Sequence, residues 1–250
     1  GGKMKSYYLT DVGKVRSHNE DSVTIVKNGS EEYLLMVADG MGGHRAGEVA
    51  SSLAITHLGK RFSSLSSIGS LKDAVTWLND NVSEINGAIL DYAKNHHDST
   101  GLGTTLVLAL LTEKFLIFGN IGDSSGYVLK NNRLHKVTKD HTLVNLLVEA
   151  GDITAEEAKS HPQKNVLMKA LGAGEKIEMD IFDVERDVDG IFLCSDGVTN
   201  MLTNEQIEKV LDEDLTIEEK VKKIIRKCNA RGGQDNISVA FLSMKSRCEE

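Results

Sequence analysis

The chain has 250 residues, of which 40% are hydrophobic and 26% are charged, a composition typical of one globular domain. Its net charge of −8 argues against nucleic acid or an anionic membrane as a partner, and no apolar run reaches the roughly 18 residues of a membrane span. The three cysteines, Cys194, Cys228 and Cys248, form neither a disulfide framework nor a zinc pattern, and no signal peptide opens the chain. We therefore expect a cytoplasmic protein.

The tripeptide Gly1-Gly2-Lys3 before Met4 is typical of an expression-vector remnant. Pro162 is the single proline, so no proline-rich linker divides the chain. We expect one domain over residues 4–245.

The first half of the chain alternates short apolar runs with two longer amphipathic segments. Apolar residues recur at helical spacing in these segments, which predicts helices at about 46–62 and 71–92. The short runs predict strands at 6–11, 22–26, 33–38, 105–111 and 115–120.

The second half begins with strands and ends with helices. Asn131-Asn132 is a hairpin-turn signal, and Thr154 with Glu157 has the spacing of a capping box. Because strands and helices do not alternate regularly, the fold class is α+β with antiparallel sheets. The predicted strands are 126–130, 134–137, 177–184, 191–195 and 237–244, and the predicted helices are 141–150, 154–160, 203–211 and 216–228.

The strand predicted at 33–38 ends in Asp39, which is followed by Gly40, Gly42 and Gly43. Asp-Gly is a strong hairpin-turn dipeptide, which favours a simple turn. A carboxylate at the end of a rigid strand, beside exposed backbone carbonyls, also suits a hard cation. On this stretch alone, both interpretations remain open.

Other carboxylates stand at strand boundaries, most of them beside glycine: Glu20, Asp21, Asp123, Asp196 and Asp235. If the strands form two stacked sheets, these ends can converge at one edge. Converging carboxylates repel one another and are costly to desolvate, so they require a compensating charge. An all-oxygen ligand set indicates Mg²⁺ or Mn²⁺ and not zinc. Asp189-Gly190 has no such glycine cluster and is interpreted as a plain turn.

Together with Arg16, these segments resemble the metal-dependent protein serine/threonine phosphatases of type 2C (the PPM family), in their compact bacterial form. The matching segments follow the family's order and cover nearly the whole chain. They are Gly13-x-x-Arg16-x-x-Asn19-Glu20-Asp21, Asp39-Gly40-Met41-Gly42-Gly43-His44, Gly101-Leu102-Gly103-Thr104-Thr105, Gly122-Asp123-Ser124, Asp140-His141, His161-Pro162-x-x-Asn165, Cys194-Ser195-Asp196-Gly197 and Gly233-Gln234-Asp235-Asn236-Ile237.

The resemblance implies a four-layer α-β-β-α sandwich, in which helix pairs flank two antiparallel β-sheets. It places a metal site at one end of the sandwich and a flap subdomain at about 141–172 beside that site. It also implies hydrolysis of phosphoserine and phosphothreonine in proteins by a water activated between two Mn²⁺ or Mg²⁺ ions. No protein nucleophile is then needed, and we expect Cys194 to be a buried strand thiol.

The resemblance also implies roles for individual residues. Asp39 would bridge two metals, and the Gly40 carbonyl would bind the second, which Glu20 reaches through water. Arg16 would bind the substrate phosphate, a bidentate task that suits a guanidinium. The remaining implied metal ligands are Asp196 and Asp235 at the first metal, and Asp123 with Asp196 at a third.

Several positions depart from the family's pattern or keep their role open. His44 is our candidate general acid, although eukaryotic relatives place a histidine where this chain has Met41. Ser125 stands where the family usually has arginine, and Lys164 and Lys169 also replace common arginines. The further candidates for substrate contact are His161 and Lys169, with His141 expected to serve structure or substrate contact.

The implied partners are phosphoproteins and, by family analogy, a bacterial serine/threonine kinase and that kinase's substrates. We expect a monomer. Two alternatives are a catalytically weak phosphoprotein-binding protein of the same fold and a less selective metal phosphoesterase. Retention of Arg16, Asp39, Asp196 and Asp235 argues against a pure binding protein, because such a protein has no use for a complete cation cage.

Overall fold

The computed structural model describes residues 4–244. The expected remnant Gly1-Gly2-Lys3, the expected domain end at residue 245 and Cys248 lie outside the described residues. Within the described part of the chain, no helix is both long and apolar enough to span a membrane.

One sheet has five strands in the order β1-β11-β10-β7-β8, all antiparallel to their neighbours. The last strand of the chain, β11, therefore lies between β1 and β10, and Lys5 of β1 pairs with Ser243 of β11. The bounds are β1 (Lys5–Asp11), β7 (Ser125–Lys130), β8 (Arg133–Lys136), β10 (Gly190–Cys194) and β11 (Ile237–Ser243).

The second sheet has the order β2-β3-β5-β6-β9, again antiparallel, with the two-residue strand β4 paired to the end of β3. The bounds are β2 (Asp21–Lys27), β3 (Tyr33–Met41), β4 (Gly103–Thr104), β5 (Leu106–Leu111), β6 (Leu116–Ile121) and β9 (Asp180–Val184).

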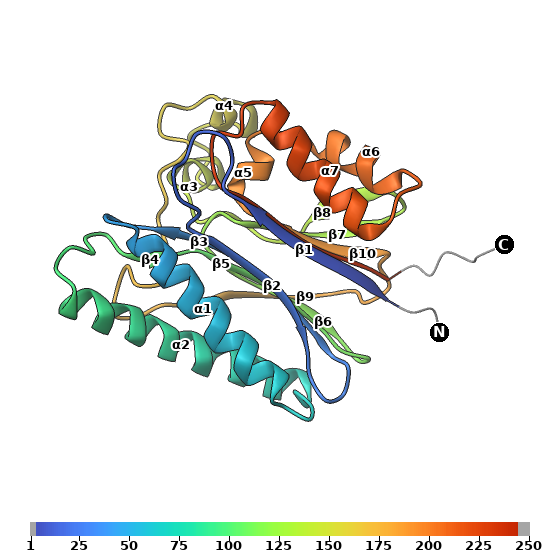
Figure 1. The fold of residues 1–250 in the computed structure, drawn as a ribbon, viewed down its shortest axis with the longest axis horizontal. Coiled ribbons are helices and arrows are strands. Elements are labelled where there is room, and N and C mark those ends of the chain that lie inside the picture. The colour runs from blue at the N-terminus through green and yellow to red at the C-terminus, as the bar shows by residue number, and fades with distance from the viewer. Residues whose placement is uncertain (1–3, 245–250) are drawn as a thin grey trace.

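Helices cover the outer face of each sheet, which gives four layers (Figure 1). Helices α1 (Ala46–Ser63) and α2 (Leu71–Asn95) cover the second sheet, and α6 (Asn204–Asp212) and α7 (Ile217–Ala230) cover the first. The sequence prediction of an α+β sandwich with flanking helix pairs is confirmed. The shorter helices are α3 (Leu143–Glu149), α4 (Ala155–Lys159) and α5 (Asp196–Thr199).

The core follows the alternation of side chains along each strand. In β3, Leu34 and Met36 pack against α1 and α2, whereas Leu35 and Val37 pack against the other sheet. In β10, Cys194 faces the helices and is completely buried, as expected for a strand thiol. Burial raises the pKa of this thiol far above its ordinary value, so Cys194 is no nucleophile.

Two strand boundaries differ from the prediction. β3 continues beyond residue 38, through Asp39 and Gly40 to Met41, and pairs there with Gly103 and Thr104. Of the two interpretations left open for Asp-Gly, the hairpin turn is therefore excluded. The strand predicted at 177–184 begins only at Asp180, because pairing with β6 begins there. The residues after β10 form the short helix α5, for which no element was predicted, because four residues are too few to show a helical period.

Candidate metal centre

The carboxylates gather where the apolar layer between the two sheets ends. Asp39 follows Leu35 and Val37 on the inner face of β3, and Asp21 pairs with Asp39 across the β2–β3 ladder. Asp21 is 7% exposed, and its Oδ2 accepts a hydrogen bond of 2.7 Å from Ser238 Oγ of β11. The strand alternation that builds the core thus also directs these carboxylates between the sheets.

Three carboxylates supply oxygens that lie within 4.8 Å of one another: Asp39, Asp196 and Asp235. Asp196 is the first residue of α5 and is separated from β10 by Ser195 alone. Asp235 is separated from β11 by Asn236. Among residues 4–244, this is the one group of at least three His, Cys, Asp or Glu side chains whose ligand atoms converge in this way. The sequence-predicted convergence of strand ends is therefore present.

Several oxygens at this point have no hydrogen-bond partner among the described residues. They are Glu20 Oε2, Asp21 Oδ1 and Asp196 Oδ1, and all three are buried. A buried oxygen left without a partner is costly, and this cost is larger for a charged group. A set of carboxylate oxygens without donors is what a hard divalent cation requires, so the residues present fit Mg²⁺ or Mn²⁺.

The electrostatics of the cluster also favour a bound cation. Burial raises the pKa of Asp39 well above its ordinary value, and the neighbouring carboxylates Asp21 and Asp196 raise it further. Burial likewise raises the pKa of Asp196. The pKa of Asp21 rises to about 7 because of burial, with Asp196 and Asp235 adding repulsion. Without a cation, these groups resist ionisation at neutral pH.

Close packing at Gly40 sets the position of Glu20. The Gly40 N–H donates to the Glu20 carbonyl over 3.0 Å, and a side chain at Gly40 would collide with the Gly47 carbonyl of α1. A side chain at Gly47 would in turn collide with Glu20 Oε2. Burial raises the pKa of Glu20, whereas the Arg16 charge lowers it. The two glycines therefore allow β3, α1 and Glu20 to meet at the pocket.

Asp123 sits on a loop that His141 holds in place. Gly122, at φ +108°, turns the chain after β6, and its N–H donates to His141 Nδ1 over 2.9 Å. His141 Nε2 lies 2.8 Å from Asp180 Oδ2, so its N–H donates to that carboxylate. Burial raises the pKa of Asp123 to about 7, and Asp196 contributes repulsion. His141 therefore has a positioning role, one of the two alternatives that we expected for it.

Arg16 lies on the loop after β1, and its Nε is 3.5 Å from Asp235 Oδ1. Asn236 anchors this loop: its Nδ2 donates to the carbonyls of Val12 and His18, each over 2.9 Å, and its Oδ1 accepts from the Glu20 N–H over 2.9 Å. This role of Asn236 was not predicted. The signal present in the sequence was an asparagine directly after a candidate ligand carboxylate, Asp235.

These elements surround a pocket of about 490 Å³. Asp123 and Arg16 lie in its wall, but His44, His161 and Lys169 are not among the described residues that line it. His44 is exposed, with φ +52°, in the loop before α1. The lining residues are Arg16, His18, Glu20, Asp39, Gly40, Met41, Gly42, Thr105, Asp123, Asn165, Leu167, Asp196, Gly197, Asn200, Met201, Gln234, Asp235 and Asn236.

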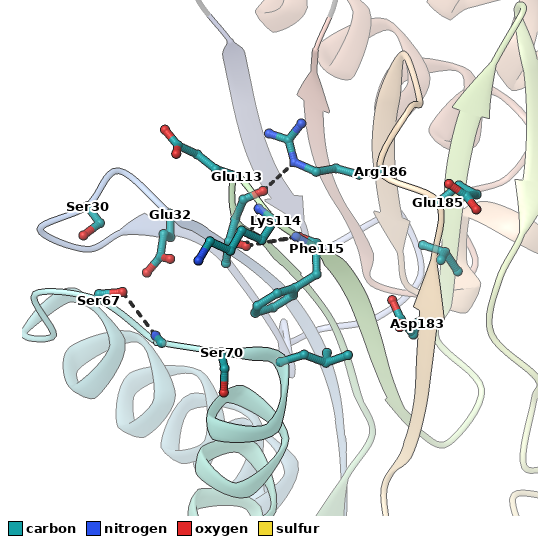
Figure 2. Close-up of a pocket in the computed structure, with 14 residues that line it drawn as sticks. Ser30, Glu32, Ser67, Ser70, Glu113, Lys114, Phe115, Asp183, Glu185 and Arg186 are labelled. Carbon is teal, nitrogen blue, oxygen red and sulfur yellow. Dashed lines mark hydrogen bonds between the residues drawn. The ribbon is translucent and has the colours of Figure 1, made fainter.

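A larger hollow, of about 1220 Å³, lies at the opposite end of β5 and β6 and contains none of the clustered carboxylates. Figure 2 shows the Phe115 ring directed toward the segment of Ser67 and Ser70, with Asp183 of β9 across from it. Glu32 Oε1 there accepts hydrogen bonds from the Asn28 side chain and the Ile68 N–H. This hollow lacks the ligand geometry of the carboxylate pocket, which remains the candidate site.

Comparisons with known proteins find a matching family and similar structures. The family model described as "Protein phosphatase 2C" matches residues 13–240. A serine/threonine phosphatase stp of Listeria welshimeri is 41% identical over 96% of this chain and 95% of its own length. The Streptococcus agalactiae serine/threonine phosphatase structure has a TM-score of 0.92 at 36% identity, covering 97% of this chain and 100% of that one. The PstP catalytic domain, solved with two manganese ions, has a TM-score of 0.81 at 34% identity, covering 96% of this chain and 97% of that one.

Proposed function

The chain belongs to the protein phosphatase 2C family, and we propose that it hydrolyses phosphoserine and phosphothreonine in proteins with divalent metals held at the carboxylate pocket. The observation that carries this proposal is the convergence of Asp39, Asp196 and Asp235 beside buried oxygens that lack hydrogen-bond donors. A complete cage of this kind favours catalysis over the alternative of a phosphoprotein-binding protein.

The metals are Mn²⁺ or Mg²⁺, two at the core and a third beside them. Manganese in the PstP neighbour supports the choice of ion. Bound metals would supply a water of lowered pKa as the nucleophile. The proposed ligands are Asp39 for both core ions, Asp196 and Asp235 for the first, the Gly40 carbonyl and, through water, Glu20 for the second, and Asp123 with Asp196 for the third.

The chain's own residues bind and orient the phosphoryl group. Arg16 is exposed enough to reach an incoming phosphate, and its guanidinium suits bidentate binding. Met41, Leu167 and Met201 supply apolar surface in the pocket wall, which limits water around the reacting group. His44 is the proposed general acid, and His161 and Lys169 are proposed contacts to the protein substrate outside the pocket wall.

We also propose the wider setting of the enzyme. Residues 141–172 act as a flap subdomain of the single domain: Asn165 and Leu167 of this segment line the carboxylate pocket, and Leu167 forms a β-bridge with Thr142. The substrates are phosphoproteins, and a bacterial serine/threonine kinase phosphorylates them. The enzyme acts as a monomer in the cytoplasm.

The proposal is tested by phosphate release from a phosphothreonine peptide. We expect turnover with Mn²⁺ or Mg²⁺ and none after addition of EDTA, with recovery when Mn²⁺ is restored in excess. A small ester such as p-nitrophenyl phosphate serves as the comparison substrate. Activity that persists in EDTA contradicts metal dependence. A preference for the small ester over the phosphopeptide supports the alternative of a less selective phosphoesterase.

Replacing Arg16 with alanine is expected to raise the KM for phosphopeptide about 10- to 100-fold, because charge-assisted hydrogen bonds contribute about 1.5–3 kcal/mol each. Arg16→Lys should recover part of this loss, since an ammonium keeps the charge but not the fork. The measurements are steady-state kinetics and a Mn²⁺ titration. An unchanged KM together with weaker Mn²⁺ binding would instead show that Arg16 positions Asp235 and does not bind the phosphate.

A further inference from the structure

A second hollow opens from the carboxylate pocket. It has a volume of about 470 Å³ and lies between α3, α4 and α5. Four residues line both spaces: Asp123, Asn165, Asp196 and Asn200. A polypeptide whose phosphorylated side chain occupies the first space therefore has a neighbouring side chain at the mouth of the second.

The far wall of this hollow is not used by the proposed hydrolysis. It comes from the two short helices α3 and α4 and is largely apolar. The apolar lining residues are Val144, Val148, Ala155 and Ala158. Methylene groups of a substrate side chain can pack against this surface while its polar end stays at the rim.

Two cationic side chains also line the hollow, those of Lys159 and Lys164. Lys164 is exposed and makes no ion pair with any described residue. Lys159 pairs with Glu156 over 3.1 Å, but both side chains are largely exposed, at 75% and 84%, so this pair is weak. Two poorly compensated lysines therefore line one hollow.

The carboxylates of the hollow do not cancel these lysines. Asp140 is paired with Lys136 over 2.8 Å. Asp123 and Asp196 belong to the proposed metal ligands. The lysines therefore leave positive charge available at the hollow, and this charge complements an acidic side chain.

We propose that this hollow, lined by α3 and α4, is a substrate subsite that selects an aspartate or glutamate near the phosphorylated residue. The inference rests on the proposed function. Because the two spaces share four lining residues, the selected position lies close to the phosphorylated one along the peptide. The lysines attract the carboxylate, and the apolar wall packs against its methylene groups.

The test uses phosphothreonine peptides in which aspartate, alanine or lysine occupies each position from −3 to +3. For the unchanged enzyme, we expect kcat/KM to be about three- to tenfold higher with aspartate than with lysine at one or two positions, as exposed charge pairs permit. Lys159→Glu combined with Lys164→Glu should reverse this order at the same positions. For the alanine peptide, kcat/KM should differ less than twofold between the unchanged enzyme and the double-Glu variant.

The matched control combines Lys72→Glu with Lys114→Glu, which makes the same change in net charge far from the pocket. It should keep the preference for aspartate, as should Lys159→Arg with Lys164→Arg. Higher salt should reduce the preference, because it screens exposed charges.

Equal kcat/KM for the three peptides at every position overturns the inference. A double-Glu variant that loses kcat/KM equally for all three peptides also overturns it. Best turnover with an apolar residue assigns the hollow to packing alone. Failure to hydrolyse any peptide contradicts the proposed function instead.

Discussion

Asp39→Asn is expected to lower phosphopeptide turnover by at least about 1,000-fold, because it removes the carboxylate assigned to both core metals. That loss corresponds to about 4 kcal/mol of transition-state stabilisation, within the several kcal/mol that metal ions supply. Asparagine keeps the shape of the side chain, so the strand pairing of β3 with β2 and β5 should survive. The measurement is kcat with saturating Mn²⁺.

A second readout separates lost chemistry from lost folding. Asp39 is crowded by other carboxylates, so the neutral amide should raise the Tm of the EDTA-treated protein at pH 8. The same variant should lose the Mn²⁺-dependent rise in Tm, because ligand binding stabilises only what it binds. Asp80→Asn on the exposed side of α2 is the control and should change neither quantity. Turnover near that of the unchanged enzyme would remove Asp39 from the metal centre.

The metal-free protein is expected to lose stability as the pH rises from about 5.5 to 7. Asp21 and Asp123 both have a pKa of about 7 in the fold, against a usual value near 4. The folded state therefore binds more protons than the unfolded chain between these values. Their contribution to stability is complete below the unfolded pKa and is lost as the pH rises through the folded one. At about 1.4 kcal/mol per pH unit, each group contributes a change of about 2 kcal/mol over this range.

Urea unfolding in EDTA at a series of pH values measures this slope. Asp123→Asn should remove about half of this slope of unfolding free energy against pH, because one of the two groups is lost. Saturating Mn²⁺ should flatten or invert the slope, since the cation then stabilises the ionised carboxylates. Asp80→Asn should leave it unchanged. A metal-free protein whose stability is constant over this range would show that the two carboxyl groups are not perturbed by burial.

The α+β class and most elements were predictable because they follow from short-range patterns, whereas the four-layer sandwich and the roles of the carboxylates were implied by the resemblance to type 2C phosphatases. Apolar periodicity located the long helices, and apolar runs located most strands. Asp39 could be assigned to a strand end because its apolar run stops there. Asp21 was predictable on the same grounds: it stands two residues before Val23, whose side chain faces the inter-sheet layer. Strand alternation therefore places its carboxylate there too.

Other features depend on contacts that no local pattern encodes. The continuation of β3 through Gly40 requires a partner strand at Thr104, and that strand is only two residues long. Asn236 acquires its role by bonding to the loop that carries Arg16, more than 200 residues earlier. The hollow beside α3 and α4 exists because these short helices lie next to α5, an arrangement that sequence periodicity cannot predict.

The central place of β11 has a consequence for the synthesis of the protein. Glu20 and Asn236 are bonded across 216 residues, and Asp21 meets Ser238 across 217. Asp235 enters the pocket only when β11 inserts between β1 and β10. A nascent chain can thus bury α1 and α2 against the second sheet on the ribosome, yet it cannot complete the carboxylate cluster before Asp235 and β11 have emerged. We therefore expect phosphatase activity only after translation has passed the last strand.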